Sequence, residues 1–352
     1  MLSTFSSNAI LAKTRAMFEQ RLKEADYRAL LNCATVNDIA AYLKQHTWYA
    51  ETLAPVNERD AHRGYMEMLM RQKLFRDFSS LCRYELSVGE HFADYLIARS
   101  EIEQIMHSLM LLAAGKSEAY VFSLPPYLSQ HTHIDLHALS KTKDFHDFLS
   151  ALGNTRYRRL LEPYAPSPGE KIPFAKIENK LYTVLYENVY RTINRYAHGK
   201  AKRELRELFD SYLDFENYAR IWRMKYFYHM SSEEIRPLLL PFGSFSQRQL
   251  DGMLGASDAS EVKERMSRTS RGKQAARLDY NFVDELPLRV RHLQSRHAIR
   301  FSTYPSVIML SYIFLMEIEM ENITNIIEGI RYQIPKEETL KLLIYYKTKQ
   351  EA

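Results

Sequence analysis

Two short sequence patterns alternate three times along the 352-residue chain, and this alternation limits the folds that the chain can adopt. The first pattern is a small or polar turn followed by a short amphipathic helix. Its copies are ATVNDIAAYLKQHTWY (34–49), SKTKDFHDFLSALGNTRY (140–157) and GASDASEVKERMSRTS (255–270). Each copy has two apolar anchors four residues apart, which share one face of a helix. With small gaps, a threonine follows each predicted helix, at Thr47, Thr155 and Thr269.

The second pattern is an acid followed three positions later by an amide and then by an apolar helix face. Its copies are EIEQIMHSLMLLAA (101–114), DFENYARIWRMKYF (214–227) and EMENITNIIEGIRY (319–332). The acid and amide pairs are Glu101/Gln104, Asp214/Asn217 and Glu319/Asn322. We interpret each pair as the start of a helix, hydrogen-bonded to the backbone or to a neighbouring helix. Gly329 takes the place of Met224 in this alignment, which predicts a close helix approach despite a cost of about 1 kcal/mol in helix propensity.

A repeat of about 110 residues is far longer than a solenoid repeat and fits a triplicated small helical domain. The expected units are residues 1–117, 118–235 and 236–352.

Helical spacing of apolar residues extends over almost the whole chain, and alternation at period two is rare. The spacing predicts helices over 18–31, 65–86 and 92–112, and over 176–229 with Gly199 as the only break. Proline-containing loop signals at 124–126, 162–169 and 241–244 are expected to separate units. The sequence therefore predicts an all-α protein.

Several function classes are disfavoured by composition. The net charge is only +5, from 48 basic and 43 acidic residues, which does not by itself indicate nucleic-acid binding. The longest apolar run, 307–316, is about half the length that a bilayer requires. The first residues of the sequence show no signal-peptide pattern. Cys33 and Cys82 are the only cysteines, so we expect buried thiols in a reducing cytoplasm rather than a disulfide framework.

The chain resembles the C subunit of archaeal and bacterial A/V-type rotary ATPases, which is called the d subunit in the eukaryotic V-ATPase. The residues that carry the resemblance are DFENYARIWRMKYF with the following SSEEIRPLLLPFGSFS (231–246), and EMENITNIIEGIRY. Gln104 departs from the asparagine of this pattern, and the corner Pro241-Phe242-Gly243 lacks a doubled glycine.

The resemblance implies a funnel of three pseudo-symmetric helical domains on the cytoplasmic face of the membrane. A protein of this kind binds the axle subunits of the central stalk and the membrane proteolipid ring, and turns with the ring. It transmits torque between proton or sodium flow and ATP chemistry elsewhere. It has no catalytic residues, cofactor or metal, and no nucleic-acid partner is expected.

Basic residues are the candidates for partner binding. Ten lie between positions 263 and 300, against four acids, and they suit an acidic axle or ring loop, or anionic lipid headgroups. The alternative is a solvated helix face. The residues that we predict to contact partners are Arg220, Arg223, Lys225, Arg265, Arg268, Arg271 and Lys273.

Two other functions fit parts of the sequence. The 263–300 stretch suits a helical nucleic-acid-binding module, in which Trp222 and residues 226–228 would stack on bases, although aromatic residues at helical spacing are more often core. The second of these functions is that of an enzyme. It rests on HTHIDLH (131–137), whose histidines are potential metal ligands. Exposed loop histidines are the plainer interpretation. Glutamates 317, 319, 321 and 328 lack a partner for acid–base chemistry, and Glu319 is expected on a different helix face from the others. No nucleotide-binding loop is present in the sequence.

Overall fold

Helices are the only regular elements in the part of the chain that the computed structural model describes, residues 2–57, 59–85, 88–167 and 169–345. The all-α prediction is therefore confirmed. Pro168, which belongs to the predicted 162–169 loop, lies outside the described residues, as do residue 1 and residues 346–352 at the ends of the first and third expected units.

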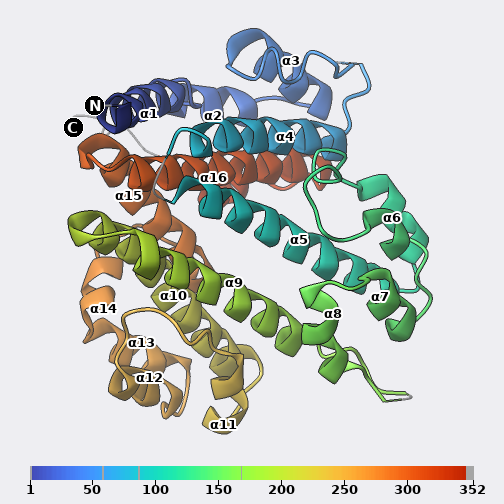
Figure 1. Ribbon diagram of the computed structural model, residues 1–352, viewed down its shortest axis with the longest axis vertical. Helices are drawn as coiled ribbons and strands as arrows, with labels where there is room; N and C mark the ends of the chain where they lie inside the picture. The colour runs from blue at the N-terminus through green and yellow to red at the C-terminus, as the bar shows by residue number, and fades with distance from the viewer. Residues whose placement is uncertain (1, 58, 86–87, 168, 346–352) are drawn as a thin grey trace.

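Three pairs of long consecutive helices form the body of the molecule (Figure 1). They are α4 (Arg63–Cys82) and α5 (Gly89–Ala113), α9 (Phe174–Tyr196) and α10 (Gly199–Phe227), and α15 (Leu286–Phe301) and α16 (Pro305–Arg331). The break predicted at Gly199 is confirmed, because this residue has a φ of +57°, which favours glycine, at the turn between α9 and α10. A proline at the first position begins α16, where its missing N–H costs nothing.

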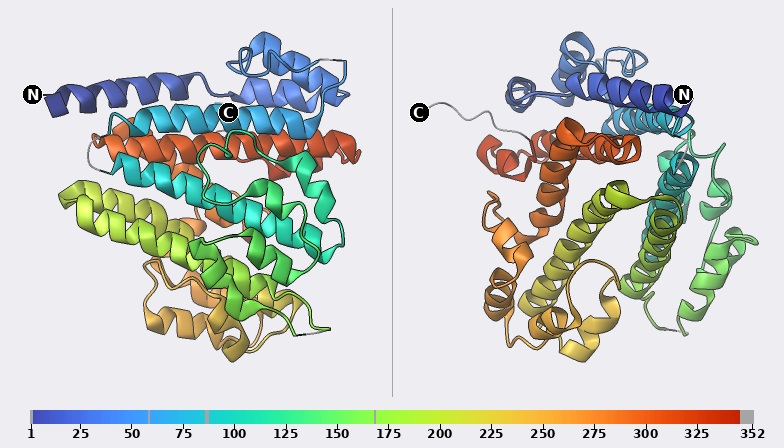
Figure 2. Two further views of the ribbon diagram at one scale, coloured as in Figure 1. Left: turned by 45° about the vertical axis from the view of Figure 1, so that its right-hand side comes forward. Right: turned by 60° about the vertical axis from the view of Figure 1, so that its left-hand side comes forward.

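The other helices lie beside these pairs (Figure 2). On one side are α1 (Leu2–Glu19), α2 (Glu24–Leu31), α3 (Val36–His46) and α17 (Lys336–Leu342). After α5 come η1 (Ser117–Ser123), α6 (Leu136–Leu139), α7 (Phe145–Ala151), α8 (Arg156–Leu161) and η2 (Glu162–Tyr164). After α10 come α11 (Ser232–Ile235), η3 (Arg236–Leu238), α12 (Gln247–Leu254), α13 (Ala259–Ser267), α14 (Ser270–Ala275) and η4 (Val283–Glu285).

The short helices of the first pattern are α3, α7 and α13, and all three begin in the same way. The side chains of Thr35, Asp144 and Asp258 each accept a hydrogen bond from the backbone N–H three residues later. This interaction satisfies a donor that the first turn of a helix leaves free, and so fixes where the helix begins. The predicted short amphipathic helices are therefore confirmed.

One predicted helix is wrong. The apolar spacing from 18 to 31 indicated a single helix, but α1 ends at Glu19 and α2 begins at Glu24. The backbone N–H of Leu22 donates instead to the side chain of Glu319, 2.8 Å away. Lys23 then adopts an extended conformation, and its N–H donates to Asp26 in the first turn of α2. A contact distant in sequence thus overrides the local helical pattern.

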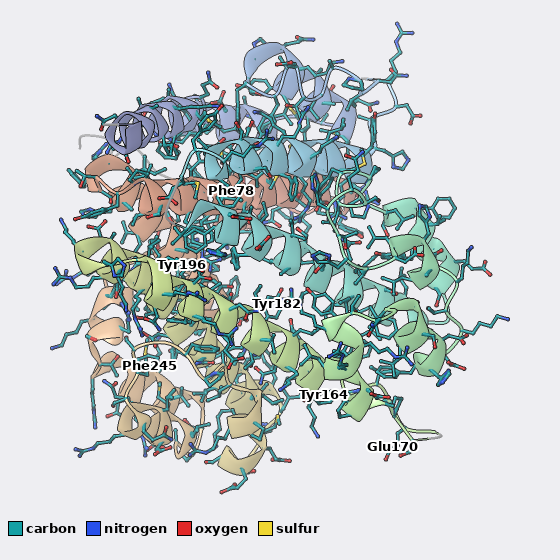
Figure 3. The ribbon with its side chains drawn as sticks, in the orientation of Figure 1. Phe78, Tyr164, Glu170, Tyr182, Tyr196 and Phe245 are labelled. Carbon is teal, nitrogen blue, oxygen red and sulfur yellow. The ribbon has the colours of Figure 1, made fainter. Side chains whose placement is uncertain are left out.

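The apolar run at 307–316 lies in the core. Residues 306–316 on α16 are all buried, among α1, α4, α10 and α15. Phe78 of α4, which is fully buried, belongs to the same core (Figure 3). Among the described residues, none of the helices combines the length and apolar character needed to cross a bilayer.

The close helix approach predicted at Gly329 is confirmed. An added Cβ at this residue would lie 2.5 Å from Oγ1 and 3.0 Å from Cγ2 of Thr339, on α17. Thr339 is buried, so it has little room to move away. The glycine lets α17 pack directly on the last turns of α16.

We expect Gly329→Ala to lower the free energy of unfolding by about 1–2 kcal/mol, because the overlap with Thr339 outweighs the gain in helix propensity. Gly252→Ala is the matched control. Gly252 also lies in a helix, but an added Cβ there would meet nothing within 4 Å. This control should therefore stabilise the protein by up to about 1 kcal/mol. Urea unfolding followed by circular dichroism measures both, and equal signs for the two changes would contradict the close approach.

Candidate functional site: three buried carboxylates and the basic surface

Each copy of the second pattern contributes one buried carboxylate. The side chains of Glu101, Asp214 and Glu319 lie on α5, α10 and α16, with exposed fractions of 0%, 0% and 4%. Our interpretation of these acids as helix starts was wrong, because all three lie in the middle of their helices. Buried charges require hydrogen-bond partners, and each carboxylate accepts bonds from segments distant in the sequence.

Glu319 joins α16 to the first fifty residues. Its carboxylate accepts hydrogen bonds from the backbone N–H of Leu22 at 2.8 Å, from Nε1 of Trp48 at 3.1 Å and from the hydroxyl of Tyr49 at 2.8 Å. Burial raises the pKa of Glu319 to about 7, although these hydrogen bonds and the positive charge of Arg21 act in the opposite direction.

Glu101 joins α5 to the segment that contains the histidine-rich loop. Its carboxylate accepts hydrogen bonds from the hydroxyl of Thr132 at 2.9 Å, the backbone N–H of His133 at 2.7 Å and the hydroxyl of Tyr157 at 2.6 Å. The loop therefore contributes a hydroxyl and a backbone N–H to this contact. The segment 131–137 thus has a structural role that does not involve an imidazole.

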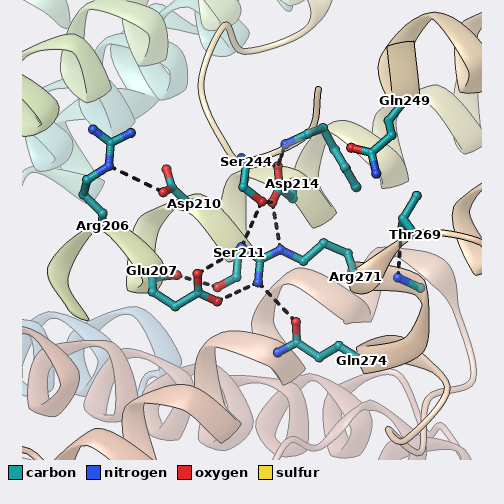
Figure 4. A network of polar contacts seen from close by, with 12 residues as sticks. Arg206, Glu207, Asp210, Ser211, Asp214, Ser244, Gln249, Thr269, Arg271 and Gln274 are labelled. Carbon is teal, nitrogen blue, oxygen red and sulfur yellow. Dashed lines mark hydrogen bonds and ion pairs between the residues drawn. The ribbon is translucent and has the colours of Figure 1, made fainter. Parts of the chain in front are cut away.

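Asp214 has the densest network of the three (Figure 4). It accepts hydrogen bonds from the backbone N–H groups of Ser244 and Phe245 at 2.8 and 3.1 Å, and from the Ser244 hydroxyl at 2.6 Å. Nε of the buried Arg271 donates to it at 2.8 Å, and the same guanidinium reaches Glu207 at 2.6 Å. Gly243 makes the contact possible, because its φ is +115° and an added Cβ would lie 2.3 Å from Oδ1 of Asp214.

In all three contacts, the residue that donates to the buried acid stands at the same position relative to the first pattern. Tyr157, Arg271 and Tyr49 each follow an aligned threonine of the first pattern by two positions, and each donates to a buried acid. We call these contacts the three joints, Glu101–Tyr157, Asp214–Arg271 and Glu319–Tyr49. The threonines were visible in the sequence, but the donors two positions later were missed because they differ in residue type. The sequence signal that could have identified them is a polar hydrogen-bond donor at the same aligned position in each copy.

Two of the three amides of the second pattern bind backbone groups of the segment that follows their own long helix. The Asn217 side chain donates to the carbonyl of Leu240 at 2.8 Å and accepts from its N–H at 2.9 Å. Asn322 makes the same pair of bonds with Ile344, at 2.9 and 2.8 Å. Gln104, the residue that departs from the pattern, accepts from the hydroxyl of Tyr120 instead.

The predicted partner-binding residues are mostly engaged within the fold. Arg271 is buried in a joint, and Arg220 donates to the carbonyl of Leu238. Of the rest, Arg223 pairs with Asp284 at 3.5 Å, and Arg265 and Arg268 pair with glutamates one turn earlier in α13. Lys273 is exposed and Lys225 partly so. For all seven residues, contact with a partner remains a prediction.

Two of the other basic residues of 263–300 are also engaged within the fold. Arg291 is buried with its guanidinium 3.3 Å from the centre of the Tyr212 ring, and Arg289 pairs with Glu285 at 2.7 Å. No observation therefore favours nucleic-acid binding over the alternatives.

The aromatic cluster at the end of α10 is more exposed than expected. Tyr226, Phe227 and Tyr228 have exposed fractions of 54%, 60% and 68%, so the prediction that they are core was wrong. They occupy the last turn of α10 and its cap. Trp222 is half-buried and stacks on Tyr226, with ring centres 4.8 Å apart.

The structure also bears on the predictions for the two cysteines and for the glutamates of α16. Cys82 is buried, and burial raises the pKa of its thiol to about 12, whereas Cys33 is only partly buried. Glu319 lies apart from Glu317 and Glu328, as predicted, since these two pair with Arg99 and Arg63.

The histidine-rich loop does not gather its side chains around one point. His131 packs against the ring of Phe75, with ring centres 5.0 Å apart, while Asp135 caps α6. In the described part of the chain, one group of possible metal ligands does converge, formed by Asp144, His146 and Asp147. Asp144 is already the cap of α7, and its neighbours are exposed or half-buried, so the group has a local structural explanation.

Comparison with known proteins identifies the family. The model of the ATP synthase (C/AC39) subunit family matches residues 10–342, which is nearly the whole chain. The chain belongs to this family. The resemblance inferred from the two repeated patterns is thereby confirmed.

Two relatives of this C/AC39 family member are named as the C subunit of A-type ATP synthase. The protein from Pyrococcus furiosus is 24% identical over 214 residues, covering 58% of this chain and 56% of the relative. The protein from Pyrococcus abyssi is 22% identical over 189 residues, covering 52% and 50%. In both cases the chain spans about half the length of the relative that it matches.

Proposed function

We propose that this chain is the non-catalytic central-stalk subunit of a V/A-type rotary ATPase. In this role it couples the central axle to the membrane proteolipid ring, so that proton or sodium transport is linked to ATP synthesis or hydrolysis. It acts at the cytoplasmic face of the membrane, as a peripheral protein. The observation that carries the proposal is the C/AC39 family match over residues 10–342.

The proposal includes an internal triplication, in which the long helix of each copy receives the short helices of the next. Glu101 of the first expected unit (1–117) bonds to Tyr157 of the second (118–235). Asp214 of the second bonds to Arg271 of the third (236–352). Glu319 of the third bonds to Tyr49 of the first, so the series of joints closes on itself. This cyclic order supports three related units better than three independent domains.

The closed cycle suits a part that transmits torque. A hydrogen bond to a buried charge in a low-dielectric surrounding is stronger than one at the surface, and breaking it exposes an unpaired charge. Each joint ties a long helix to the neighbouring unit by at least three such bonds. Relative rotation of two units therefore requires several of these bonds to break together, and the rotor body resists twisting.

A non-catalytic role is supported by the groove between α5 and α9. This groove of about 770 Å³ is lined by His91, His133 and Glu101 among arginine and tyrosine side chains. The buried carboxylate of Glu101 is already bound by three donors of the fold. A carboxylate held in this way is a structural acceptor and not a free general base.

The test is removal of the chain from the host that makes it. Vesicles prepared without it should lose ATP-driven ion uptake, while the detached ATPase head still hydrolyses ATP. Adding the purified chain back should restore uptake, and in detergent extracts it should copurify with the axle and the ring. Ion uptake that survives removal, or a chain that never copurifies with those components, would refute the proposal.

A further inference from the structure

The outward face of α15 carries two exposed apolar side chains on one line. Leu293 and Phe301 have exposed fractions of 46% and 61%. They lie eight residues apart with His297 between them, so all three share one face of the helix. Along the helix axis this ridge is roughly 12 Å long, which corresponds to two turns.

A groove runs along each side of this ridge. The first, of about 840 Å³, lies between α15 and the start of α10, and includes Lys200, Arg203 and Leu208. The second, of about 490 Å³, lies between α15 and α1, and includes Arg15 and Phe18. Leu293, His297 and Phe301 line both grooves, so the ridge separates two hollows of a size that accepts side chains.

Basic side chains outnumber acidic ones along the two grooves. Their three acids already have cationic partners: Glu19 pairs with Arg21, Glu204 with Lys200 and Glu207 with Arg271.

The remaining arginines of the grooves include several without a carboxylate. Arg15 donates to the backbone carbonyls of Ile299 and Ser302, at 2.9 and 2.8 Å. Arg203 and Arg300 are exposed, and neither forms an ion pair with the residues that the structure describes. The apolar ridge is thus bordered on both sides by arginines that are available to an acidic partner.

We propose that the α15 ridge and its two grooves bind an acidic amphipathic helix of a partner protein. Apolar side chains of that helix enter the grooves beside Leu293 and Phe301, and its carboxylates pair with Arg203 and Arg300. The grooves on the two sides of the ridge favour side chains of a protein over a flat bilayer surface. This inference does not depend on the proposed rotor function, because it follows from the shape and charge of α15 and its neighbours alone.

Photocrosslinking in the host cell tests the proposal. The crosslinking amino acid p-benzoylphenylalanine is placed at position 301, and the crosslinked peptides are identified by mass spectrometry. We expect a partner segment with apolar residues at helical spacing and several acids. Combining the probe with Arg203→Glu and Arg300→Glu should lower its yield about tenfold, since charge reversal on both sides opposes an acidic partner.

Matched controls define the opposite result. The same probe at position 122 replaces Phe122, an aromatic side chain that is 91% exposed on η1. Lys141→Glu combined with Lys143→Glu serves as the matched control for charge reversal, because both lysines are exposed in the segment that precedes α7. The proposal is wrong if the probe at 301 captures lipid, a second copy of the chain or nothing above the level at 122. It is also wrong if the captured segment lacks acids, or if Arg203→Glu with Arg300→Glu lowers the yield no more than Lys141→Glu with Lys143→Glu.

Discussion

Asp214→Ala is expected to lower the free energy of unfolding by about 3–5 kcal/mol, the largest effect of any single substitution considered for this protein. The change removes the acceptor of four hydrogen bonds, two from backbone N–H groups of residues 244 and 245. It also leaves the buried guanidinium of Arg271 with Glu207, whose side chain is half exposed, as its remaining carboxylate. A buried charge that loses its partner keeps the cost of desolvation without the compensating attraction.

The control for this prediction is Asp284→Ala. Asp284 also pairs with an arginine, Arg223, but the two side chains are 48% and 44% exposed and the charged atoms are 3.5 Å apart. Surface pairs of this kind contribute about 0–1 kcal/mol, so this variant should unfold at nearly the wild-type urea concentration. Equal losses for Asp214→Ala and Asp284→Ala would mean that the Asp214–Arg271 joint does not hold the α13–α14 segment on α10.

The second large effect concerns the pH dependence of stability at Glu319. Burial raises the pKa of this carboxyl from an ordinary value of 4.5 to about 7 in the folded protein. Between these two values the folded protein binds a proton that the unfolded chain has released. The stabilisation from this proton is therefore complete below pH 4.5 and is lost as the pH rises through 7. The total change is about 3 kcal/mol, from the conversion of pKa differences into free energy.

Glu319→Gln isolates this contribution, because glutamine has the same size and no titratable proton. The difference in unfolding free energy between wild type and Glu319→Gln should change by about 3 kcal/mol between pH 4.5 and pH 8, with the wild type relatively more stable at the acidic end. Urea titrations at several pH values measure this difference. A difference that does not vary with pH would mean that Glu319 ionises in the folded protein as easily as in the unfolded chain.

Much of the fold was predictable from short-range patterns. The α4–α5 and α9–α10 pairs follow from apolar residues at helical spacing, and Gly199 marks a true break. The acid and amide positions were also visible, because the same pair of residue types recurs in the same order. Repetition indicated that these residues matter before any of their contacts was known.

The parts that could not be predicted depend on contacts distant in sequence. The helix expected over 18–31 breaks because Leu22 bonds to a residue far along the chain. The residues around Tyr226, at the end of α10, are exposed, and spacing alone cannot indicate which end of a helix the rest of the fold covers. The donors of the joints are a tyrosine, a tyrosine and an arginine, so no single residue type marks their position.

The Glu319 joint also constrains the order in which the protein is made. The carboxylate that binds Leu22, Trp48 and Tyr49 is added 270 to 297 residues after them, and contacts between such distant residues form slowly. The other two joints need only a few dozen more residues of chain, so they can form during synthesis, which proceeds from the N-terminus. The segment from Leu22 to Tyr49 is therefore fixed in place later than the segments of the other two joints, because it waits for α16 to be synthesised.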